Sequence, residues 1–565
     1  MLVRSNRGSA GLSLDGAWER LAEALGLGLR GARRRYAVML ALAGAVGAAG
    51  ALSGCKGKGE PPKEGVVSLS GETPAATNEP ALDPAMEPKP GGPRIGAVEM
   101  AAPIFLKPDR RSAKIGYLRA GATALRGEKP VAFDDCRGGY YKIAPIGYVC
   151  ADEEATLDMK HPVLRALTRR PDLSKPMPYP YAFVRAIAPN YYRVPTMKEQ
   201  LQYEMKLKEH LKSYKRLQKK WDAVHVGAND VPLDEQGNAI GEPPSEVPER
   251  SDNELFGGDG SDAIPWFFQD GRKIPNISTF KAPDYAIITN RIARHAGIAL
   301  IDSFQGEGRR FAMTTDARLV PASKIKPETG STFHGVDMAS GKWQLPLAFV
   351  RRPDANRYDV SEKSLKKAGD AELHSAVQLT GKSIKIGDKR LVEAKDGTWL
   401  KDEDLAIVVK SSELPPFATG SRKWIDISIL GQVLILYEGA KPVYATAVST
   451  GRDGMGDPKS TFSTVRGTFK IREKHVTTTM DAHEVDNKFE LRDVPWVQYF
   501  EKGYALHAAL WHDEFGKPRS HGCVNMSPID ARRVFMWTDP PLPTDWHGVY
   551  AAEPTGEGTM VHIHP

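Results

Sequence analysis

A cysteine and three histidines lie close together near the end of this 565-residue chain. The segment 504–525 contains His507, His512, His521 and Cys523. A cysteine attacks a carbonyl as its thiolate, and a neighbouring imidazole can take the thiol proton. These residue types predict acyl transfer, with Cys523 as the nucleophile and His507 as its base.

The residues next to Cys523 suit a loop that presents a nucleophile. Gly522 removes a side chain there, so the backbone can bend and its N–H groups can face a developing oxyanion. His521 is expected to line the pocket and to help the oxyanion or the ring orientation. Taken singly, a cysteine or a histidine is more often a structural residue. The order and spacing of the group favour chemistry.

The same four side chains, His507, His512, His521 and Cys523, are also possible zinc ligands. Gly522 and the spacing fit a nucleophile loop better than the closed pairs of structural zinc sites. The sequence therefore predicts no metal at this site.

The sequence Ser-His-Gly-Cys-Val-Asn at 520–525, with His507 ahead of it, is similar to the signature of YkuD-type L,D-transpeptidases. The segments 449–451 and 467–471 are also similar to that domain. The resemblance covers residues 421–553 and implies a β-sandwich catalytic domain there. Such domains often carry Thr-Pro two residues before the glycine, where this chain has Thr464-Val465-Arg466-Gly467, a position expected to lie away from the nucleophile.

The resemblance implies an enzyme of peptidoglycan synthesis and cell wall biogenesis. Cys523 would attack the third-residue carbonyl of a tetrapeptide stem, release D-alanine and pass the acyl group to an amine, which gives a 3–3 cross-link. Water as the acceptor would make the protein an L,D-carboxypeptidase, and a protein lysine would make it a wall-attachment enzyme. No cofactor is implied, and carbapenems are expected to acylate Cys523.

Further site residues follow from the same comparison. A main-chain carbonyl, that of Ala508, is expected to orient the ring of His507. Arg519 offers a forked cation to a stem-peptide carboxylate. The residues expected to hold the loop or to bind substrate are Arg519, Ser520, Asn525, Trp511 and Tyr504.

The N-terminus has the order of an export signal. Arg33-Arg34-Arg35 precedes an apolar stretch at 36–52, and Leu52-Ser53-Gly54-Cys55 is similar to a bacterial lipobox. This predicts a signal peptide over 1–54, lipidation of Cys55 and a lipid-anchored protein at the periplasmic face of the envelope, with the outer membrane favoured. A retained transmembrane anchor is the alternative.

Charge and cysteine count limit the other function classes. Residues 1–54 hold seven arginines and three acidic residues, so they carry more than half of the net charge of +7. No basic face remains for nucleic acid. In an oxidising compartment Cys136 and Cys150 are expected to form a disulfide, which leaves Cys523 unpaired. The oligomeric state stays open.

The rest of the chain is predicted to be mainly β and multidomain. Residues 55–96 are rich in Pro and Gly and predict a disordered tether, and 97–155 are similar to an SH3-like barrel. A helix opened by Thr196 is expected over 196–221, within a helical and polar-loop region at 156–262. Residues 263–415 predict β-rich accessory modules. A wall-binding lipoprotein with an inactive transpeptidase domain is the alternative function, against which the presence of both His507 and Cys523 argues.

Overall fold

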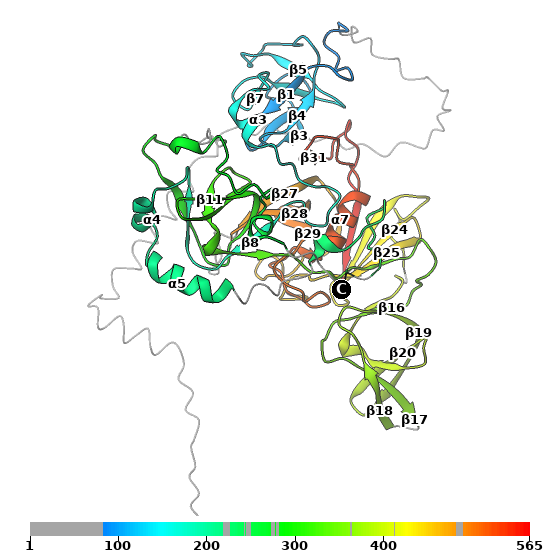
Figure 1. The fold of residues 1–565 in the computed structure, drawn as a ribbon. Helices are drawn as coiled ribbons and strands as arrows, with labels where there is room; N and C mark the ends of the chain where they lie inside the picture. Colours follow the sequence, from blue (N-terminus) through cyan, green and yellow to red (C-terminus); the bar gives the residue numbers. More distant parts are fainter. Residues whose placement is uncertain are drawn as a thin grey trace, which may run out of the picture. The chain divides into compact units, whose positions relative to one another are not determined.

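A computed structural model describes most of the chain beyond the N-terminal region. The described residues are 83–218, 227–241, 243–244, 250–272, 277, 282–361, 364–411, 413–481 and 490–565. They all belong to one compact unit, Pro80–Pro565. The predicted signal peptide, Cys55 and most of the predicted tether lie outside them. The predicted mainly β, multi-sheet architecture is confirmed (Figure 1). No helix in these ranges has the length and apolar character needed to cross a bilayer.

Short antiparallel strands enclose the core of the N-terminal module, residues 83–156. One sheet has the order β4-β1-β7, and β2 pairs with both β3 and β6. An SH3-like barrel remains a prediction with which this arrangement is compatible. The strands are β1 (Arg94–Ala97), β2 (Ala102–Phe105), β3 (Lys114–Leu118), β4 (Thr123–Leu125), β5 (Tyr140–Lys142), β6 (Tyr148–Cys150) and β7 (Ala155–Thr156).

The predicted tether ends earlier than residue 96. Ile95 is fully buried in β1, and Lys129 N–H donates to the carbonyl of Ala85. Glu87 forms an ion pair with Lys142. The Pro- and Gly-rich composition of this stretch does not predict β1, a strand of four residues. Pairing with β4 and β7 stabilises this strand.

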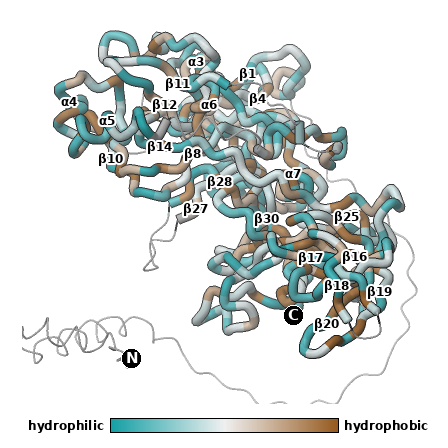
Figure 2. The backbone as a smooth tube through the Cα atoms, turned by 60° about the horizontal axis from the view of Figure 1, so that its bottom comes forward, coloured by the Kyte–Doolittle hydropathy of each residue, from teal (hydrophilic) through white to brown (hydrophobic). Residues whose placement is uncertain are grey.

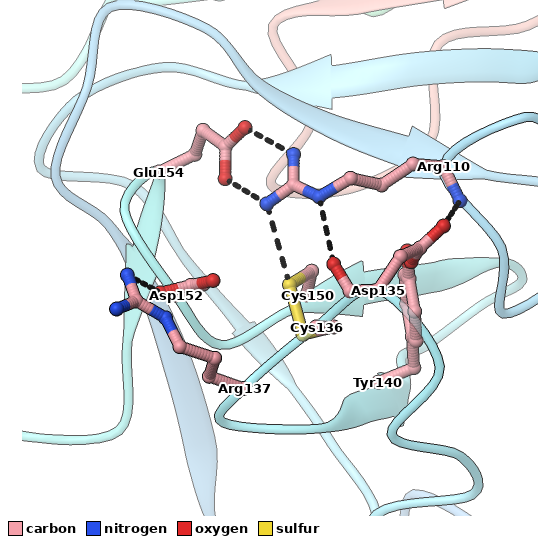
Figure 3. The surroundings of a disulfide bond; sticks show 8 residues. All are labelled: Arg110, Asp135, Cys136, Arg137, Tyr140, Cys150, Asp152 and Glu154. Carbon is pink, nitrogen blue, oxygen red and sulfur yellow. Dashed lines mark hydrogen bonds and ion pairs between the residues drawn. A yellow bond between two sulfur atoms is a disulfide. The ribbon is translucent and has the colours of Figure 1, made fainter.

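Cys136 and Cys150 form a disulfide with a Cα–Cα distance of 5.9 Å (Figure 3). Cys150 lies opposite Tyr140 in the β5–β6 hairpin. The guanidinium of Arg110 donates to both carboxylate oxygens of Glu154 and reaches Cys150 Sγ at 3.6 Å. A cross-link over such a short loop contributes about 2–4 kcal/mol, largely by restricting the unfolded chain.

The central module, residues 162–328, surrounds β11, which also joins it to the C-terminal region. β11 pairs with β12 and β8, and its first residue, Gly297, pairs in parallel with Leu491 of β28 (Figure 1). The strands are β8 (Tyr181–Val184), β9 (Ala188–Tyr191), β10 (Ile288–Ile292), β11 (Gly297–Gly306), β12 (Arg309–Thr314), β13 (Leu319–Pro321) and β14 (Ile325–Glu328). The helices are α3 (Pro162–Ala166), α4 (Met197–Tyr203), α5 (Leu207–Gln218) and α6 (Asp252–Leu255), with short 3₁₀ turns η1 (Ala228–Asp230), η2 (Gln269–Gly271) and η3 (Ala322–Lys324).

The single helix predicted over 196–221 is wrong, because the chain forms α4 and α5 with a break between them. The capping box of Thr196 and Glu199 is present. The break follows from Glu204, which is 3% exposed and forms an ion pair with buried Arg309. Residue Lys206 then adopts a φ of 51°. A tertiary ion pair thus interrupts a pattern that is locally helical.

A seven-stranded sheet forms the third module, residues 347–408, in which hydrophobic stretches alternate with hydrophilic ones (Figure 2). Its β16 and β22 pack against the C-terminal module through Phe349 and Val408. The strands are β16 (Leu347–Val350), β17 (Asn356–Ser361), β18 (Ser364–Asp370), β19 (Ala376–Ile386), β20 (Lys389–Ala394), β21 (Trp399–Lys401) and β22 (Leu405–Val408), with the 3₁₀ turn η4 (Asp402–Asp404).

Two sheets with a shared core form the C-terminal module, residues 423–564 together with β15 from the segment before the third module. One has the order β15-β25-β24-β23-β32-β26, and the other contains β31, β27, β28, β29 and β30. Helix α7 (Pro528–Trp537) packs into the core between them. The strands are β15 (Val336–Asp337), β23 (Lys423–Ser428), β24 (Val433–Glu438), β25 (Lys441–Ala447), β26 (Gly467–Lys470), β27 (Glu473–Asp481), β28 (Glu490–Glu501), β29 (Tyr504–Ala508), β30 (Val524–Met526), β31 (Gly548–Tyr550) and β32 (Met560–His564).

A buried ion pair ties three of these modules together. Arg119 of the N-terminal module donates to both carboxylate oxygens of Asp493 in β28. Asp493 also accepts hydrogen bonds from Thr477 and from Thr315 of the central module. Arg119 and the hydroxyl groups hold the pKa of Asp493 down to about 2, against the opposing effect of burial.

Replacing Arg119 by alanine should destabilise the protein strongly, because Asp493 would remain buried without its cation. The expected loss is about 3–5 kcal/mol in the free energy of unfolding. Arg94→Ala is the matched control, since Arg94 forms a more exposed ion pair with Asp545 between the same two modules. That loss should stay within about 1 kcal/mol. Equal losses of the two variants in denaturant melts would contradict the role assigned to Asp493.

Candidate active site

The register of two parallel strands places the site residues. His507 in β29 lies opposite Asn525 in β30, and Cys523 immediately precedes β30. His507 and Cys523 line the same cavity. The predicted base and nucleophile are thus brought to one site.

The cavity has a volume of about 760 Å³. Its walls come from β27, β28, β29, the loop before β30 and the central module. The lining residues are Phe183, His295, Glu328, Thr479, Met480, Leu491, Tyr499, Gly503, His507, Trp511, Arg519, Ser520, His521, Cys523 and Asn525.

Cys523 is a free thiol in a half-buried position. Burial raises the pKa of the Cys523 thiol to about 11, and a backbone hydrogen bond with Ala505 opposes this only in part. Its Sγ donates to the carbonyl of Gly503 at 3.6 Å. At neutral pH the sulfur is therefore protonated and needs a base before it can attack.

His507 has the environment of a neutral base. It is 3% exposed, and burial lowers the pKa of its ring to about 4. Its Nδ1 lies 3.0 Å from the carbonyl of Ala508. A carbonyl can only accept, so Nδ1 carries the ring proton and Nε2 keeps a free lone pair. The carbonyl of Ala508 thus has the place that the resemblance implied.

The loop before Cys523 is fixed from within. Ser520 Oγ donates to the carbonyl of Cys523 and accepts from Gly522 N–H at 3.0 Å. The N–H of Gly522 is thus engaged in the loop, contrary to the expectation that it would face an oxyanion. Thr464 Oγ1 donates to the Gly522 carbonyl at 2.8 Å and accepts from Gly451 N–H.

This contact corrects the expectation that Thr464 lies away from the nucleophile. The segment 449–451 also supports the loop, since both Arg519 N–H and Ser520 N–H donate to the carbonyl of Thr450. Thr464 therefore contributes to how the nucleophile loop is held.

Gly522→Ala should lower activity sharply. Gly522 has a φ of 128°, and an added Cβ would lie 2.7 Å from Cε1 of Tyr504. Strain of about 1–3 kcal/mol would displace the loop that carries Cys523. We expect activity to fall by about a hundredfold, because a shift of about 1 Å at a reacting group has that effect.

Gly369→Ala in β18 is the matched control for Gly522→Ala, since no atom lies within 4 Å of its added Cβ and it does not line the cavity. Its Tm and activity should both stay close to those of the wild type. If Gly522→Ala kept full activity, the requirement for glycine would be refuted.

Asn525 is positioned by His512. His512 Nδ1 accepts from Glu514 N–H, so its Nε2 carries the proton. That nitrogen lies 3.0 Å from the Asn525 amide, whose Oδ1 would otherwise be buried without a partner. Rotating the amide makes Oδ1 the acceptor of the His512 Nε2–H, so that two donors no longer face each other. Asn525 also exchanges two backbone hydrogen bonds with Ser449.

Comparison with protein families places this site in a known domain. Residues 422–563 match the model of YkuD, an L,D-transpeptidase catalytic domain. The chain contains an L,D-transpeptidase catalytic domain. The match extends past the predicted end at 553 to include β32, which pairs in parallel with β23 and completes its sheet. A search of curated proteins found no match.

Solved L,D-transpeptidase structures resemble part of the chain. That from Stackebrandtia nassauensis is 22% identical over 26% of this chain and 57% of its own, with a TM-score of 0.18. That from Xylanimonas cellulosilytica is 22% identical over 27% and 65%, with a TM-score of 0.19. The catalytic domain from Enterococcus faecium is 20% identical over 26% and 98%, with a TM-score of 0.20. The chain thus spans less than two thirds of the first two.

Three further residues predicted to belong to the site, Trp511, His521 and Arg519, differ in how they lie relative to the cavity. Trp511 lines the cavity, with its ring 5.7 Å from that of His507. His521 is exposed and packs edge-on against Phe462. Arg519 lines the cavity but forms an ion pair with Glu514 at 2.7 Å.

Tyr504, predicted to bind substrate, does not line the cavity. Its hydroxyl group donates to the carbonyl of Pro458, and its ring covers Gly522. Tyr504 therefore supports the nucleophile loop of the transpeptidase domain.

In the part of the chain that the structure describes, no three His, Cys, Asp or Glu side chains come together as a metal site. His507, His512, His521 and Cys523 are all among these residues. Their arrangement is set by separate partners, namely Ala508 for His507 and Asn525 for His512.

Sequence reasoning missed the wall of the transpeptidase cavity that comes from outside the domain. Phe183, His295 and Glu328 belong to the central module. No motif marks them, and they reach the site only because β11 pairs with β28. The sequence gives only a weak indication of this wall, namely that Glu328 is a charged residue at the end of a strand.

Proposed function

We propose that this protein is a peptidoglycan L,D-transpeptidase with Cys523 as its nucleophile and His507 as its general base. One observation supports this proposal most strongly. Cys523, with a raised thiol pKa, and His507, with a lowered ring pKa, line the same cavity in the domain that matches the transpeptidase model. Each group has the protonation state that base-assisted attack requires.

The proposed reaction has two acyl transfers. Nε2 of His507 takes the proton of Cys523, and the sulfur bonds to the third-residue carbonyl carbon of a tetrapeptide stem. The tetrahedral adduct expels the amine of D-alanine, which receives the proton from His507, and leaves a thioester. An acceptor amine then attacks the thioester, its proton passes to His507, and the thiol is restored. We assign support of the oxyanion to His521 at the cavity mouth.

The acceptor and the location belong to the same proposal. The side-chain amine of a second stem gives a 3–3 cross-link, water gives L,D-carboxypeptidase activity, and a protein lysine gives attachment of that protein. A lipid on Cys55 would anchor the enzyme in the envelope, where stem peptides lie. The Pro- and Gly-rich sequence that follows would act as a spacer from the membrane.

Incubation of the purified protein with disaccharide-tetrapeptide tests the proposal. We expect release of D-alanine together with a product that identifies the acceptor by its mass. A protein that binds the ligand and releases no D-alanine would instead be a wall-binding lipoprotein with an inactive domain.

A further inference from the structure

The central module contributes an acidic side chain to the transpeptidase cavity. Glu328 ends β14, which pairs with β8 so that Glu328 lies opposite Tyr181. Glu328 is half-buried and is the one acidic residue among the described residues that line the cavity.

One carboxylate oxygen of Glu328 is held and the other is available. Oε1 accepts from Thr329 N–H at 3.1 Å and from Gly330 N–H at 3.2 Å. Among the described residues, Glu328 forms no ion pair, and both of its hydrogen bonds are to Oε1, so Oε2 has no hydrogen-bond donor. The carboxylate of Glu328 therefore has a fixed orientation in the cavity, and no described side chain forms an ion pair with it.

The wall that carries Glu328 is rigidly attached to the catalytic module. The chain after Glu328 is tied down where Ser331 Oγ donates to Asp513, and Gly335 N–H donates to Asp530. On the other side Tyr181 donates to the carbonyl of Asp493 at 2.7 Å. The segments on both sides of Glu328 are thus anchored to the catalytic module by hydrogen bonds.

Among the described lining residues, no charged side chain forms an ion pair with Glu328, although His295 and His521 also line the cavity. Arg519 is paired with Glu514, and the depressed pKa of His507 makes its ring neutral. Phe183, Leu491 and Trp511 line the same hollow with apolar surface. A carboxylate among apolar and neutral groups attracts a cation that can also donate hydrogen bonds.

We propose that Glu328 binds a free primary ammonium group of the peptide ligand and thereby selects stem peptides whose side-chain amine is unmodified. The inference rests on the proposed function for the identity of the ligand. Glu328 is a specificity residue that acts in binding, outside the bond-making steps at Cys523.

Calorimetry in the full-length Cys523→Ala background tests this, because no turnover disturbs the measurement. The two probes are disaccharide-tetrapeptide with a free side-chain amine and the same compound N-acetylated at that amine. With Glu328 present, acetylation should weaken binding about tenfold, the effect of one lost charge-assisted hydrogen bond. In Glu328→Gln the free amine should bind about tenfold more weakly and the preference should fall below about twofold.

Glutamine can accept the same two backbone N–H bonds, so the local fold is kept, and unchanged thermal melts will verify this. Glu307→Gln is the matched control, since it removes an exposed charge from the same module. Equal affinity for the two probes with Glu328 present, a preference retained in Glu328→Gln, or binding of neither probe would overturn the inference.

D-alanine release by the wild type distinguishes a failure of this inference from a failure of the proposed function. Release without the preference refutes the inference alone, and the preference without release refutes the transpeptidase reaction alone.

Discussion

Cys523→Ala should abolish D-alanine release from disaccharide-tetrapeptide. Within the described residues Cys523 is the free cysteine, and Cys136 and Cys150 are held in a disulfide. Removal of the nucleophile of a covalent mechanism leaves only binding and orientation, so we expect a loss of at least about 10⁴-fold in kcat/KM. The fold should persist, because the thiol makes only weak contacts with the backbone, a 3.6 Å hydrogen bond to the carbonyl of Gly503 and one with Ala505.

Covalent labelling gives the same variant a second readout. A carbapenem should add once to the wild-type protein, and peptide mapping should place the adduct on the segment that contains Cys523. Cys523→Ala should acquire no adduct there. An adduct that survives the substitution, or a wild-type protein that stays unlabelled and inactive, would favour a binding protein. Cys523→Ser serves as the control for shape, since it keeps a donor of similar size.

The local parts of the site could be predicted from the sequence because they depend on short-range pattern. Ile425, Ile427 and Ile429 alternate with polar residues in the sequence, a pattern typical of a strand, and β23 forms over Lys423–Ser428. Gly431-Gln432 then leads into β24. The Cys136–Cys150 pair forms in the structure as well. Each of these features involves residues that are close in the chain.

Two features that could not be predicted from the sequence, the break after α4 and the cavity wall at Glu328, depend on contacts between residues distant in the chain. The break after α4 requires Arg309, which meets Glu204 across the central module. The wall at Glu328 requires β11 to join β28, two strands separated by the whole third module and nearly half of the catalytic domain. Pairing of this kind is set by tertiary packing, and strand propensity carries no information about partners.

Hydrogen bonds inside the nucleophile loop were also beyond sequence reasoning. A glycine beside a nucleophile suggests a free N–H, yet the N–H of Gly522 donates to Ser520. The same loop explains Tyr504, whose aromatic ring was read as a substrate contact and instead covers Gly522. Residue type indicated that these positions matter, and only the fold assigned their partners.

His507→Gln should change the pH dependence of the reaction as well as its rate. The pKa of about 4 for His507 means that the wild-type base is neutral at every pH well above 4. The pKa of about 11 for Cys523 means that the free thiolate is scarce below pH 9. Between about pH 6 and pH 8 the base is neutral and the thiol is protonated. With His507 present, kcat/KM should therefore be nearly flat over this range.

Without the imidazole, attack depends on thiolate that forms unaided. The thiolate fraction rises about tenfold for each pH unit below the thiol pKa, so log kcat/KM of His507→Gln should rise with a slope of about one from pH 6 to pH 9. At pH 7 the loss should be about 10²–10⁴-fold, the usual contribution of a general base. His521→Gln separates rate from pH dependence: because His521 is assigned support of the oxyanion, its loss should lower kcat/KM while the profile stays flat. A flat profile in His507→Gln would mean that another group ionises Cys523, and His507 would then be only a packing residue beside the thiol.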